Sequence, residues 1–248
     1  MTRTASGPAL VDAAAALTGA STAEIQYAIR FGDQPSVVTE TLLWDFRRQI
    51  GEVPPSGTRG SQDYSPELIL TPTAEYMDIS GSGLSSARWQ LETHPIAQGT
   101  QAAVETLLGQ QAPTADLGAL LRALQPLIQT VTPGGTGNVD GTHVRFYTVG
   151  ISVDTLEDAI NADAPERARM GQFYGTTLEL LIAIDSKNRI VQISEHNQSA
   201  FGPVAGTITF SHFGIAVEVT IPPPDQTYNP LQPSQNFGGS QREYSAPR

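Results

Sequence analysis

Residues 204–226 read VAGTITFSHFGIAVEVTIPPPDQ and contain two runs of alternating residues separated by a glycine. In the first run Ile208 and Phe210 alternate with polar residues, and in the second run β-branched residues occupy every second position from 215 to 221. Alternation with a period of two predicts strands that bury one face. Gly214 can adopt the positive φ that a tight reversal needs. The prolines that follow end strand pairing because proline has no N–H to donate. The stretch therefore predicts an antiparallel hairpin that closes the fold.

The same alternation recurs along most of the chain and predicts one antiparallel sheet. Residues 23–31, AEIQYAIRF, give the clearest strand, because the large apolar residues face one way and mostly polar residues face the other. Further strands are expected over residues 37–49, 67–73, 74–80, 87–92, 142–152, 176–185 and 189–197. Glycine and proline between these runs predict loops over 51–66 and 132–141. The predicted fold class is therefore α+β, with a single curved antiparallel β-sheet.

Helices are expected mainly in the middle of the chain. Residues 98–109 and 115–125 carry apolar residues at helical spacing. The apolar stripe of the second helix consists of Leu117, Leu120, Leu121 and Leu124. Such a stripe packs either as ordinary core or as the cover of a ligand cavity. Asp154 and Glu157 are spaced as a capping box for a short helix. Further helices are expected over residues 8–17 and 163–169.

The composition is that of one domain with an acidic surface. The chain has 248 residues, a length that suits one domain. Acidic residues outnumber basic ones by 25 to 14, giving a net charge of −11, and such a surface argues against binding to nucleic acid. No apolar run approaches the roughly 18–20 residues that a membrane-spanning helix needs. Cysteine is absent, which excludes disulfides, thiolate metal sites and cysteine nucleophiles.

The sequence patterns that carry catalysis or metal binding are missing. None of the histidines His94, His143, His196 and His212 lies at a metal-ligand spacing from another. Ser211 precedes His212, but neighbours on a strand point to opposite faces and cannot act together as nucleophile and base. No Gly-x-Ser-x-Gly elbow and no phosphate-binding loop occurs. We therefore expect neither an enzyme nor a resident cofactor or metal.

The C-terminal stretch also carries a family resemblance. Phe213-Gly214 separates the two alternating runs, and the triplet Pro222-Pro223-Pro224 with Asp225 follows the second. This arrangement resembles the C-terminal signature of actinobacterial extracytoplasmic lipoproteins related to LprG and LppX, which share the LolA/LolB-like half-barrel. The resemblance implies a half-barrel with helices packed on its concave face. The domain is expected over residues 9–225, with disordered segments over 1–8 and 226–248.

The resemblance further implies a monomeric protein of the cell envelope, outside the cytoplasm. The acylated N-terminal cysteine that such lipoproteins carry is absent from this sequence. We therefore expect the anchor or signal peptide to be missing from this chain. Any membrane association would depend on that anchor.

Two functions are compatible with these patterns. In the first, the protein binds or carries the acyl chains of a lipid or lipoglycan, without catalysis, in an apolar cavity between sheet and helices. Candidate cavity-lining residues are the apolar positions Ile25, Tyr27, Ile29, Trp44, Phe46, Met77, Trp89, Leu117, Leu120, Leu121, Leu124, Phe146, Leu180 and Phe210. In the second, the half-barrel is filled by its own side chains and acts as an extracytoplasmic interaction or sensory module without a lipid ligand.

Overall fold

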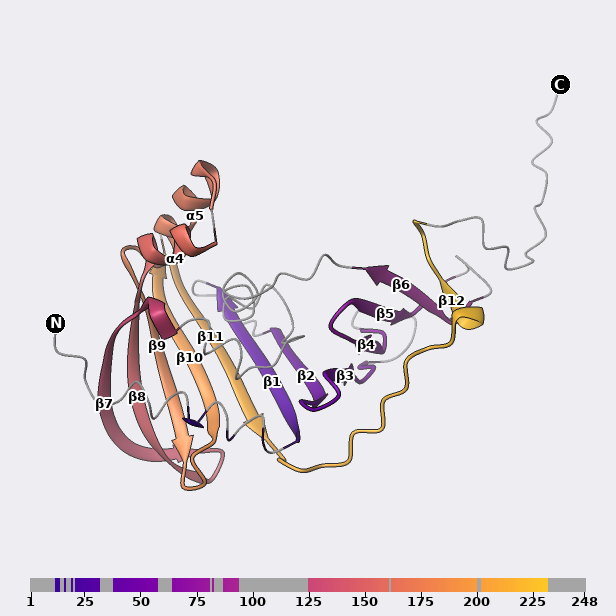
Figure 1. The fold of residues 1–248 in the computed structure, drawn as a ribbon, viewed down its shortest axis with the longest axis horizontal. Helices are drawn as coiled ribbons and strands as arrows, with labels where there is room; N and C mark the ends of the chain where they lie inside the picture. Colours follow the sequence, from indigo (N-terminus) through magenta and orange to yellow (C-terminus); the bar gives the residue numbers. More distant parts are fainter. Residues whose placement is uncertain are drawn as a thin grey trace.

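The fold is a single open sheet built mainly from antiparallel strands (Figure 1). The computed structural model describes residues 12–13, 16, 19, 21–31, 38–57, 64–80, 82, 87–93, 125–160, 162–199 and 202–231. The first six strands are β1 Thr22–Phe31, β2 Val38–Asp45, β3 Ile50–Val53, β4 Leu68–Leu70, β5 Ala74–Asp78 and β6 Trp89–Thr93. The others are β7 Ile128–Val139, β8 Thr142–Ser152, β9 Thr177–Asp185, β10 Ile190–Ser199, β11 Gly202–Ser211 and β12 Thr227–Tyr228. This architecture confirms the predicted curved, largely antiparallel sheet.

The order of these strands places the first strand, β1, beside the late strand β11 in the middle of the sheet. Across the described residues the order is β12-β6-β5-β4-β3-β2-β1-β11-β10-β9-β8-β7. Strand β1 pairs with β2 on one side and with β11 on the other, both antiparallel. The short strand β12 pairs with β6 and is parallel to it. Two meanders, one from each half of the chain, are thus joined through the β1–β11 pair.

Two α-helices lie at one end of the strands of the second meander (Figure 1). The α-helices are α4 Val153–Ala159 and α5 Ala164–Tyr174, and 3-10 turns span Gln125–Leu127 and Pro224–Gln226. The helix α4 begins after Ser152, whose Oγ accepts a hydrogen bond from the N–H of Thr155 at 3.3 Å. The predicted capping box at Asp154 and Glu157 therefore lay two residues too late: the capping side chain is the serine at the end of β8. The predicted helix over 98–109 and residues 115–124 of the second predicted helix lie outside the described residues.

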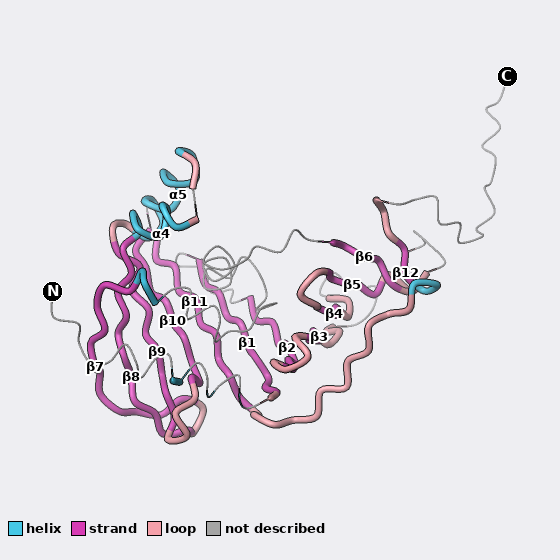
Figure 2. The backbone as a smooth tube through the Cα atoms, viewed as in Figure 1, coloured by secondary structure: helices cyan, strands magenta, loops and turns pink. Residues whose placement is uncertain are grey.

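The closing hairpin predicted at the C-terminus was wrong. The first run is strand β11, and Gly214 has a φ of 85° in the turn after it. Residues 215–223, however, belong to no strand and continue as an extended connection toward β12 (Figure 2). The reason is topological: β1 and β10 already occupy both edges of β11, so no edge is left for a returning strand. The alternation of the second run serves packing instead, because Val217 and Val219 join an apolar cluster while Glu218 and Thr220 stay exposed.

Two segments predicted as loops also belong to the sheet. Ile50–Val53 forms β3, and Ile128–Val139 forms the outer strand β7 despite its proline and glycines. Proline is tolerated on an outer strand, and the pairing of β7 with β8 is irregular between Pro133 and Thr136. A Cβ atom on Gly137 would lie 2.8 Å from Cε2 of Phe146, so the glycine leaves room for that ring.

The sheet also reaches into the region predicted as a disordered tail. Thr227 and Tyr228 pair with Trp89 and Gln90 of β6. Thr227 is buried, and its Oγ1 donates a hydrogen bond to the carbonyl oxygen of Pro223 at 2.9 Å. The ordered chain therefore continues past Asp225, which the lack of apolar periodicity had concealed.

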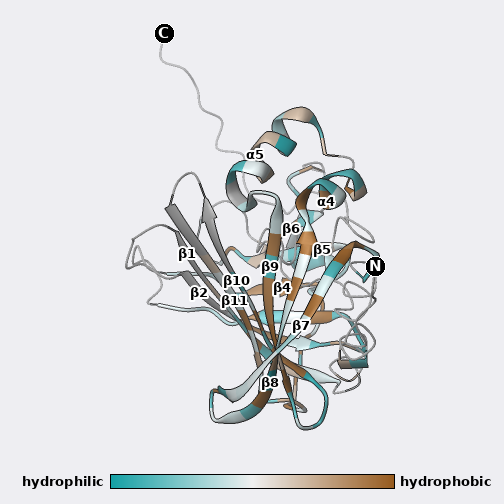
Figure 3. Cartoon of the chain, turned by 90° about the vertical axis from the view of Figure 1, so that its left-hand side faces the viewer, coloured by the Kyte–Doolittle hydropathy of each residue, from teal (hydrophilic) through white to brown (hydrophobic). Residues whose placement is uncertain are grey.

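Hydrophobic residues recur along β8 and β9, brown in Figure 3. Buried apolar side chains are distributed unequally between the two faces of the sheet. We call the face that carries Ile25, Leu42 and Leu180 the inner face, and it holds the largest buried cluster. The opposite, outer face carries two smaller clusters, one around Trp89 and one around Val144. Helices α4 and α5 add Leu156 and Met170 to the inner cluster, and Ala13, a helical residue near the N-terminus, joins it as well. The main core thus lies between the inner face and the elements that cover it.

Candidate functional site

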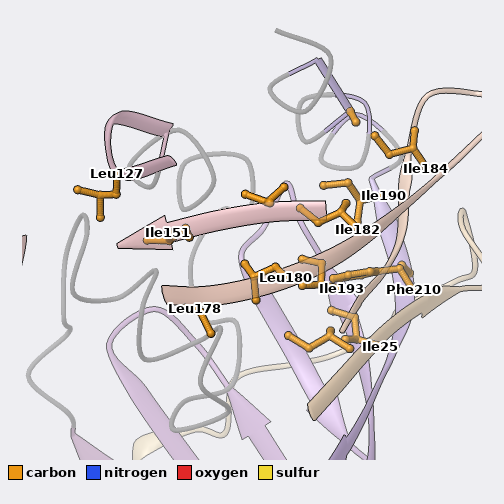
Figure 4. Close-up of a cluster of buried hydrophobic side chains, with 14 of the residues drawn as sticks. Ile25, Leu127, Ile151, Leu178, Leu180, Ile182, Ile184, Ile190, Ile193 and Phe210 are labelled. Atoms are coloured by element: carbon orange, nitrogen blue, oxygen red, sulfur yellow. The ribbon is translucent and has the colours of Figure 1, made fainter. Parts of the chain in front are cut away.

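The inner face presents rows of mostly apolar residues that run across the strands. Because side chains alternate along a strand, residues paired directly across neighbouring strands share a face. One row follows Pro133, Tyr147, Ile182, Ile193, Ile208 and Tyr27 from β7 to β1. A second row follows Val131, Val149, Leu180, Glu195, Gly206 and Ile29 across the same strands. Figure 4 shows the isoleucines and leucines of these strands gathered on one side of the sheet.

One member of the second row is a carboxylic acid in an otherwise apolar line. Glu195 lies between Leu180 of β9 and Gly206 of β11, and its side chain is only 7% exposed. Its Oε2 is buried and has no hydrogen-bond partner in the described part of the chain. A buried polar atom without a partner costs free energy and is uncommon in folded proteins. The inner face therefore carries an unmet requirement for a polar partner at one defined atom.

A glycine on the neighbouring strand provides the space that this carboxyl occupies. A Cβ atom on Gly206 would lie 2.9 Å from Oε1 and 3.0 Å from Cγ of Glu195. Contacts this short do not occur between real atoms, so any side chain at residue 206 would displace the glutamate. The two residues thus form a pair: Gly206 has no side chain, and the side chain of Glu195 occupies the space that this leaves.

Burial changes the acidity of this site. Loss of hydration raises the pKa of the Glu195 carboxyl from 4.5 to about 7. Burial, and after it the nearby charge of Glu195, raise the pKa of the Tyr174 hydroxyl on α5 above its ordinary value. A glutamate with this pKa is partly protonated near neutral pH, and it can then donate as well as accept a hydrogen bond.

Six of the predicted cavity-lining residues lie together on the inner face. They belong to or pack against the main cluster and are Ile25, Tyr27, Trp44, Phe46, Leu180 and Phe210. The indole of Trp44 lies against Gly51, and a Cβ atom on that glycine would overlap the ring. Within the described residues Trp44 Nε1 is buried without a hydrogen-bond partner, so it is a second unsatisfied polar atom on this face. Met77 pairs with Leu68, which packs on the main cluster, and therefore lies on the inner face in the β4–β6 part of the sheet.

Two of the predicted lining residues belong to the outer face. Trp89 is buried with Ile50, Ile69 and Val219, and its ring lies 4.6 Å from the guanidinium carbon of Arg88. Phe146 packs with Val144 on the opposite side of β8 from Tyr147 and Val149. Neither can line a space bounded by the inner face. In β8 large apolar residues occupy both phases, and in β6 the single apolar phase, with Trp89 and Leu91, faces outward. Periodicity alone therefore did not indicate which phase faces inward.

The remaining predicted residues cannot be compared in the same way. Ile29 pairs with Gly206 in the row that contains Glu195, but only its backbone is described. The stripe Leu117, Leu120, Leu121 and Leu124 lies outside the described residues. The role of this stripe as core or as the cover of a cavity stays a prediction.

Sequence reasoning missed Glu195, although a signal was present. In the run RIVQISEHN the glutamate stands two residues after Ile193, in the same phase as that buried isoleucine. An acid in the apolar phase of a strand is the pattern that marks a buried polar group. The signal was obscured by Val191, because the pairing of β10 with β9 shifts register between Ile190 and Gln192 and places apolar residues in both phases.

The described residues contain no grouping typical of metal or membrane proteins. Nowhere among them do three or more His, Cys, Asp or Glu side chains gather as a metal site. None of the described helices is long and apolar enough to cross a bilayer. The features that single out the inner face are its apolar rows and buried polar atoms such as Glu195 Oε2 and Trp44 Nε1.

Comparison with known proteins identifies the fold. No protein-family model matches the chain, and no curated protein matches its sequence. LprF from Mycobacterium bovis superposes with a TM-score of 0.50 and 16% identity, over 88% of this chain and 96% of that chain. This chain has the same open-sheet fold as LprF. The lipoprotein LppX from Mycobacterium tuberculosis aligns over 86% of this chain and 99% of that chain, with a TM-score of 0.47 and 11% identity. At these identities the similarity concerns the fold and not the function.

Proposed function

We propose that this protein binds the acyl chains of a lipid or lipoglycan against the inner face, and that it carries them without catalysing a reaction. The supporting observation is the apolar cluster of this face, which draws on strands β1, β2, β4 and β7–β11. Outer-face clusters are smaller and are covered in part by the connection after β11. The predicted helices over 98–109 and 115–125 would form the other wall of the binding space.

The physical basis is the transfer of methylene groups out of water. Burying one methylene contributes about 0.8 kcal/mol, so a chain of 16 carbons offers on the order of 10 kcal/mol before the cost of ordering it. Affinity of this kind needs no catalytic motif. It needs a surface that is apolar over roughly the length of the acyl chain. Neighbouring strands lie about 4.8 Å apart, so a row that crosses six strands provides roughly that length.

The family resemblance of the C-terminal stretch supports a location outside the cytoplasm, in the cell envelope. We expect a monomer. The proposed domain begins near residue 9, and its C-terminal boundary extends at least to the strand at 227–228.

One observation favours a second function, that of an interaction or sensory module without a lipid. Ile25, Ile184 and Ile190 on the inner face are fully buried by the chain itself. A face that its own chain already covers can be a filled core. In that case the protein would act through its surface, and the cluster would only stabilise the fold.

A pair of matched substitutions separates these functions. Val149 lies on the inner face and Val191 on the outer face, both are buried, and both stand in strands of the same meander. Replacing either with phenylalanine adds similar volume and costs about 1–3 kcal/mol of stability. Carriage of lipid predicts that Val149→Phe weakens uptake of a fluorescent fatty acyl probe at least about tenfold, whereas Val191→Phe leaves it unchanged.

The wild-type protein supplies the direct test of the proposal. Purified from a bacterial host and studied by native mass spectrometry, it should retain lipid, and it should take up the acyl probe with a 1:1 limit. Absence of both co-purified lipid and probe uptake would contradict the carrier function and favour the module. Circular dichroism of the two variants confirms that each is folded before binding is compared.

A further inference from the structure

Glu195 combines features that together point to a ligand contact. It is buried in the apolar row of the inner face, its Oε2 has no hydrogen-bond partner among the described residues, and Gly206 leaves the space in which it lies. Its neighbours across the strands are Leu180 and Gly206, neither of which can offer a side-chain hydrogen bond. The described part of the chain thus leaves this atom without the hydrogen bond that a buried carboxyl requires.

We propose that Glu195 is a binding residue that pairs with the free hydroxyl of a partly acylated lipid, of the diacylglycerol class, while the acyl chains lie along the apolar rows. This inference rests on the proposed acyl-binding function and deepens it. It assigns the polar end of the ligand to the Glu195–Gly206 pair and the apolar part to the rows on either side of it.

The chemistry of the carboxyl selects a hydroxyl over other polar groups. An ionised carboxylate only accepts hydrogen bonds, whereas a protonated carboxyl also donates one. A hydroxyl can serve either form, because it both donates and accepts. An ester carbonyl only accepts, so it leaves the ionised form unpaired. An ammonium group would have to give up its hydration in an apolar row, and this cost offsets the attraction to one carboxylate.

The proposal also explains why an acid at this position is compatible with ligand binding. In the absence of a ligand, Oε2 remains unsatisfied, which costs the fold free energy. A ligand hydroxyl would satisfy it in a site from which water is excluded, where a hydrogen bond to a charged group is strongest. A fully acylated lipid, which has no hydroxyl, would bury its ester groups there and leave the oxygen unpaired.

The test compares two lipids that differ only in this hydroxyl. The probes are 1,2-dioleoylglycerol and its 3-acetyl ester, each used to displace a fluorescent fatty acyl probe from the full chain at pH 8. We expect the wild-type protein to prefer the free hydroxyl by about tenfold or more, as for one hydrogen bond to a charged group. Glu195→Leu should bind both lipids equally, and Glu195→Gln should keep part of the preference.

A matched control distinguishes binding from a general effect on the fold. Glu179 is an exposed glutamate on the neighbouring strand β9, and Glu179→Leu should leave the preference unchanged. The ratio of the two affinities is the readout, because a purely structural change would alter both affinities together. The isosteric Glu195→Gln keeps the test valid if the leucine variant does not fold.

The possible failures are distinguishable. Equal affinity of the wild-type protein for the two lipids, with the acyl probe bound, would overturn the role of Glu195 and leave the carrier function standing. A preference that survives in Glu195→Leu would also overturn it. Failure of the wild-type protein to bind the acyl probe at all would overturn the carrier function, and the inference with it.

Discussion

The strands β9 and β10 carry two buried acids whose surroundings differ completely. Asp185 is 3% exposed, and its Oδ2 accepts hydrogen bonds from Nε and Nη2 of Arg189 at 2.9 and 2.7 Å. Its Oδ1 accepts from the N–H groups of Lys187 and Arg189. Glu195, in contrast, has a buried Oε2 that no described residue contacts by a hydrogen bond. The hydrogen bonds of Asp185 are therefore supplied by the turn of its own hairpin, whereas Glu195 on the inner face keeps one oxygen without a hydrogen-bond partner among the described residues.

The two faces of the sheet also differ in whether the chain's own C-terminal connection covers them. The guanidinium of Arg189 lies 3.9 Å from the centre of the Phe213 ring, and the connection that follows Phe213 continues to Val219 in the outer cluster. The N–H of Gly214 donates to the carbonyl oxygen of Thr22, and Arg48 Nη2 donates to the carbonyl oxygen of Val219. The chain's own C-terminal connection thus covers part of the outer face. We expect a ligand to cover the corresponding part of the inner face.

The largest expected effect comes from breaking the satisfied acid. Asp185→Leu would leave the guanidinium of Arg189 without its carboxylate partner and remove the hydrogen bonds that close the turn. Loss of one partner of a buried pair costs about 3–5 kcal/mol. Urea denaturation at pH 7 measures the change in the free energy of unfolding, and the double variant Asp185→Leu with Arg189→Leu should recover part of the loss. A change below about 1 kcal/mol would mean that the pair contributes little.

Substitution of the unsatisfied acid should have the opposite sign. The pKa of Glu195 is raised in the folded protein to about 7 from 4.5, so the folded state binds the proton more tightly than the unfolded chain. The stability that the protonated carboxyl allows is fully present below about pH 4.5 and is lost as the pH rises through about 7. Glu195→Gln should therefore stabilise the protein by up to about 3 kcal/mol at pH 8 and have little effect at pH 4.5.

The measurement for this substitution is thermal or urea unfolding of both proteins between pH 4.5 and pH 8.5. The difference in unfolding free energy between variant and wild type should grow with pH and level off above pH 8. A difference that does not depend on pH would show that Glu195 titrates alike in the folded and unfolded states, and the contrast with Asp185 would then disappear.

Filling the space beside Glu195 should cost less. Gly206→Ala would place a methyl group 2.9 Å from Oε1, and the glutamate must shift to avoid it. We expect a loss of about 1–3 kcal/mol. In the background of Glu195→Ala the same substitution should cost little, because the obstructing side chain is gone. Gly171→Ala in α5 is the matched control, since nothing lies within 4 Å of its Cβ position and alanine favours a helix.

The smallest effect concerns the cover of the outer face. Val219→Ala removes two methyl groups from a buried side chain and should destabilise the protein by about 1.5 kcal/mol. Its exposed neighbour Thr220 should tolerate alanine with a change below about 0.5 kcal/mol. Equal effects at the two positions would indicate that the connection does not pack on the sheet in solution.

The positions of the strands were largely predictable, because the alternation that marks them is local in the sequence. The order of the strands in the sheet was not predictable. Residues 23–31 and 142–152 were predicted within a residue or so of β1 and β8. The second half of the C-terminal stretch was misread because its alternation is equally typical of an extended segment packed on a face. Only the pairing of β11 with both β1 and β10, which links distant parts of the chain, excludes a hairpin there.

The candidate site was predictable only in part, for a related reason. Ile25, Leu180 and Phe210 lie together in the main cluster because each stands in a strand with one clear apolar phase, and their role in lining a cavity stays a prediction. Phe146 was misplaced because the glycines of β7 that accommodate its ring lie in a segment that reads as a loop. Glu195 and Gly206 become a pair only through the register of β10 with β11, which no local pattern contains.

The central claim is that acyl chains lie against the inner face, and photolabelling tests it most directly. A fatty acid carrying a diazirine on its chain is bound to the wild-type protein, irradiated, and the labelled residues are identified by tandem mass spectrometry. Our account predicts saturable labelling, competed by unlabelled lipid, on inner-face residues such as Val149, Leu180 and Ile193. Labelling that does not saturate, or that falls only on the outer connection at residues 215–221, would contradict it.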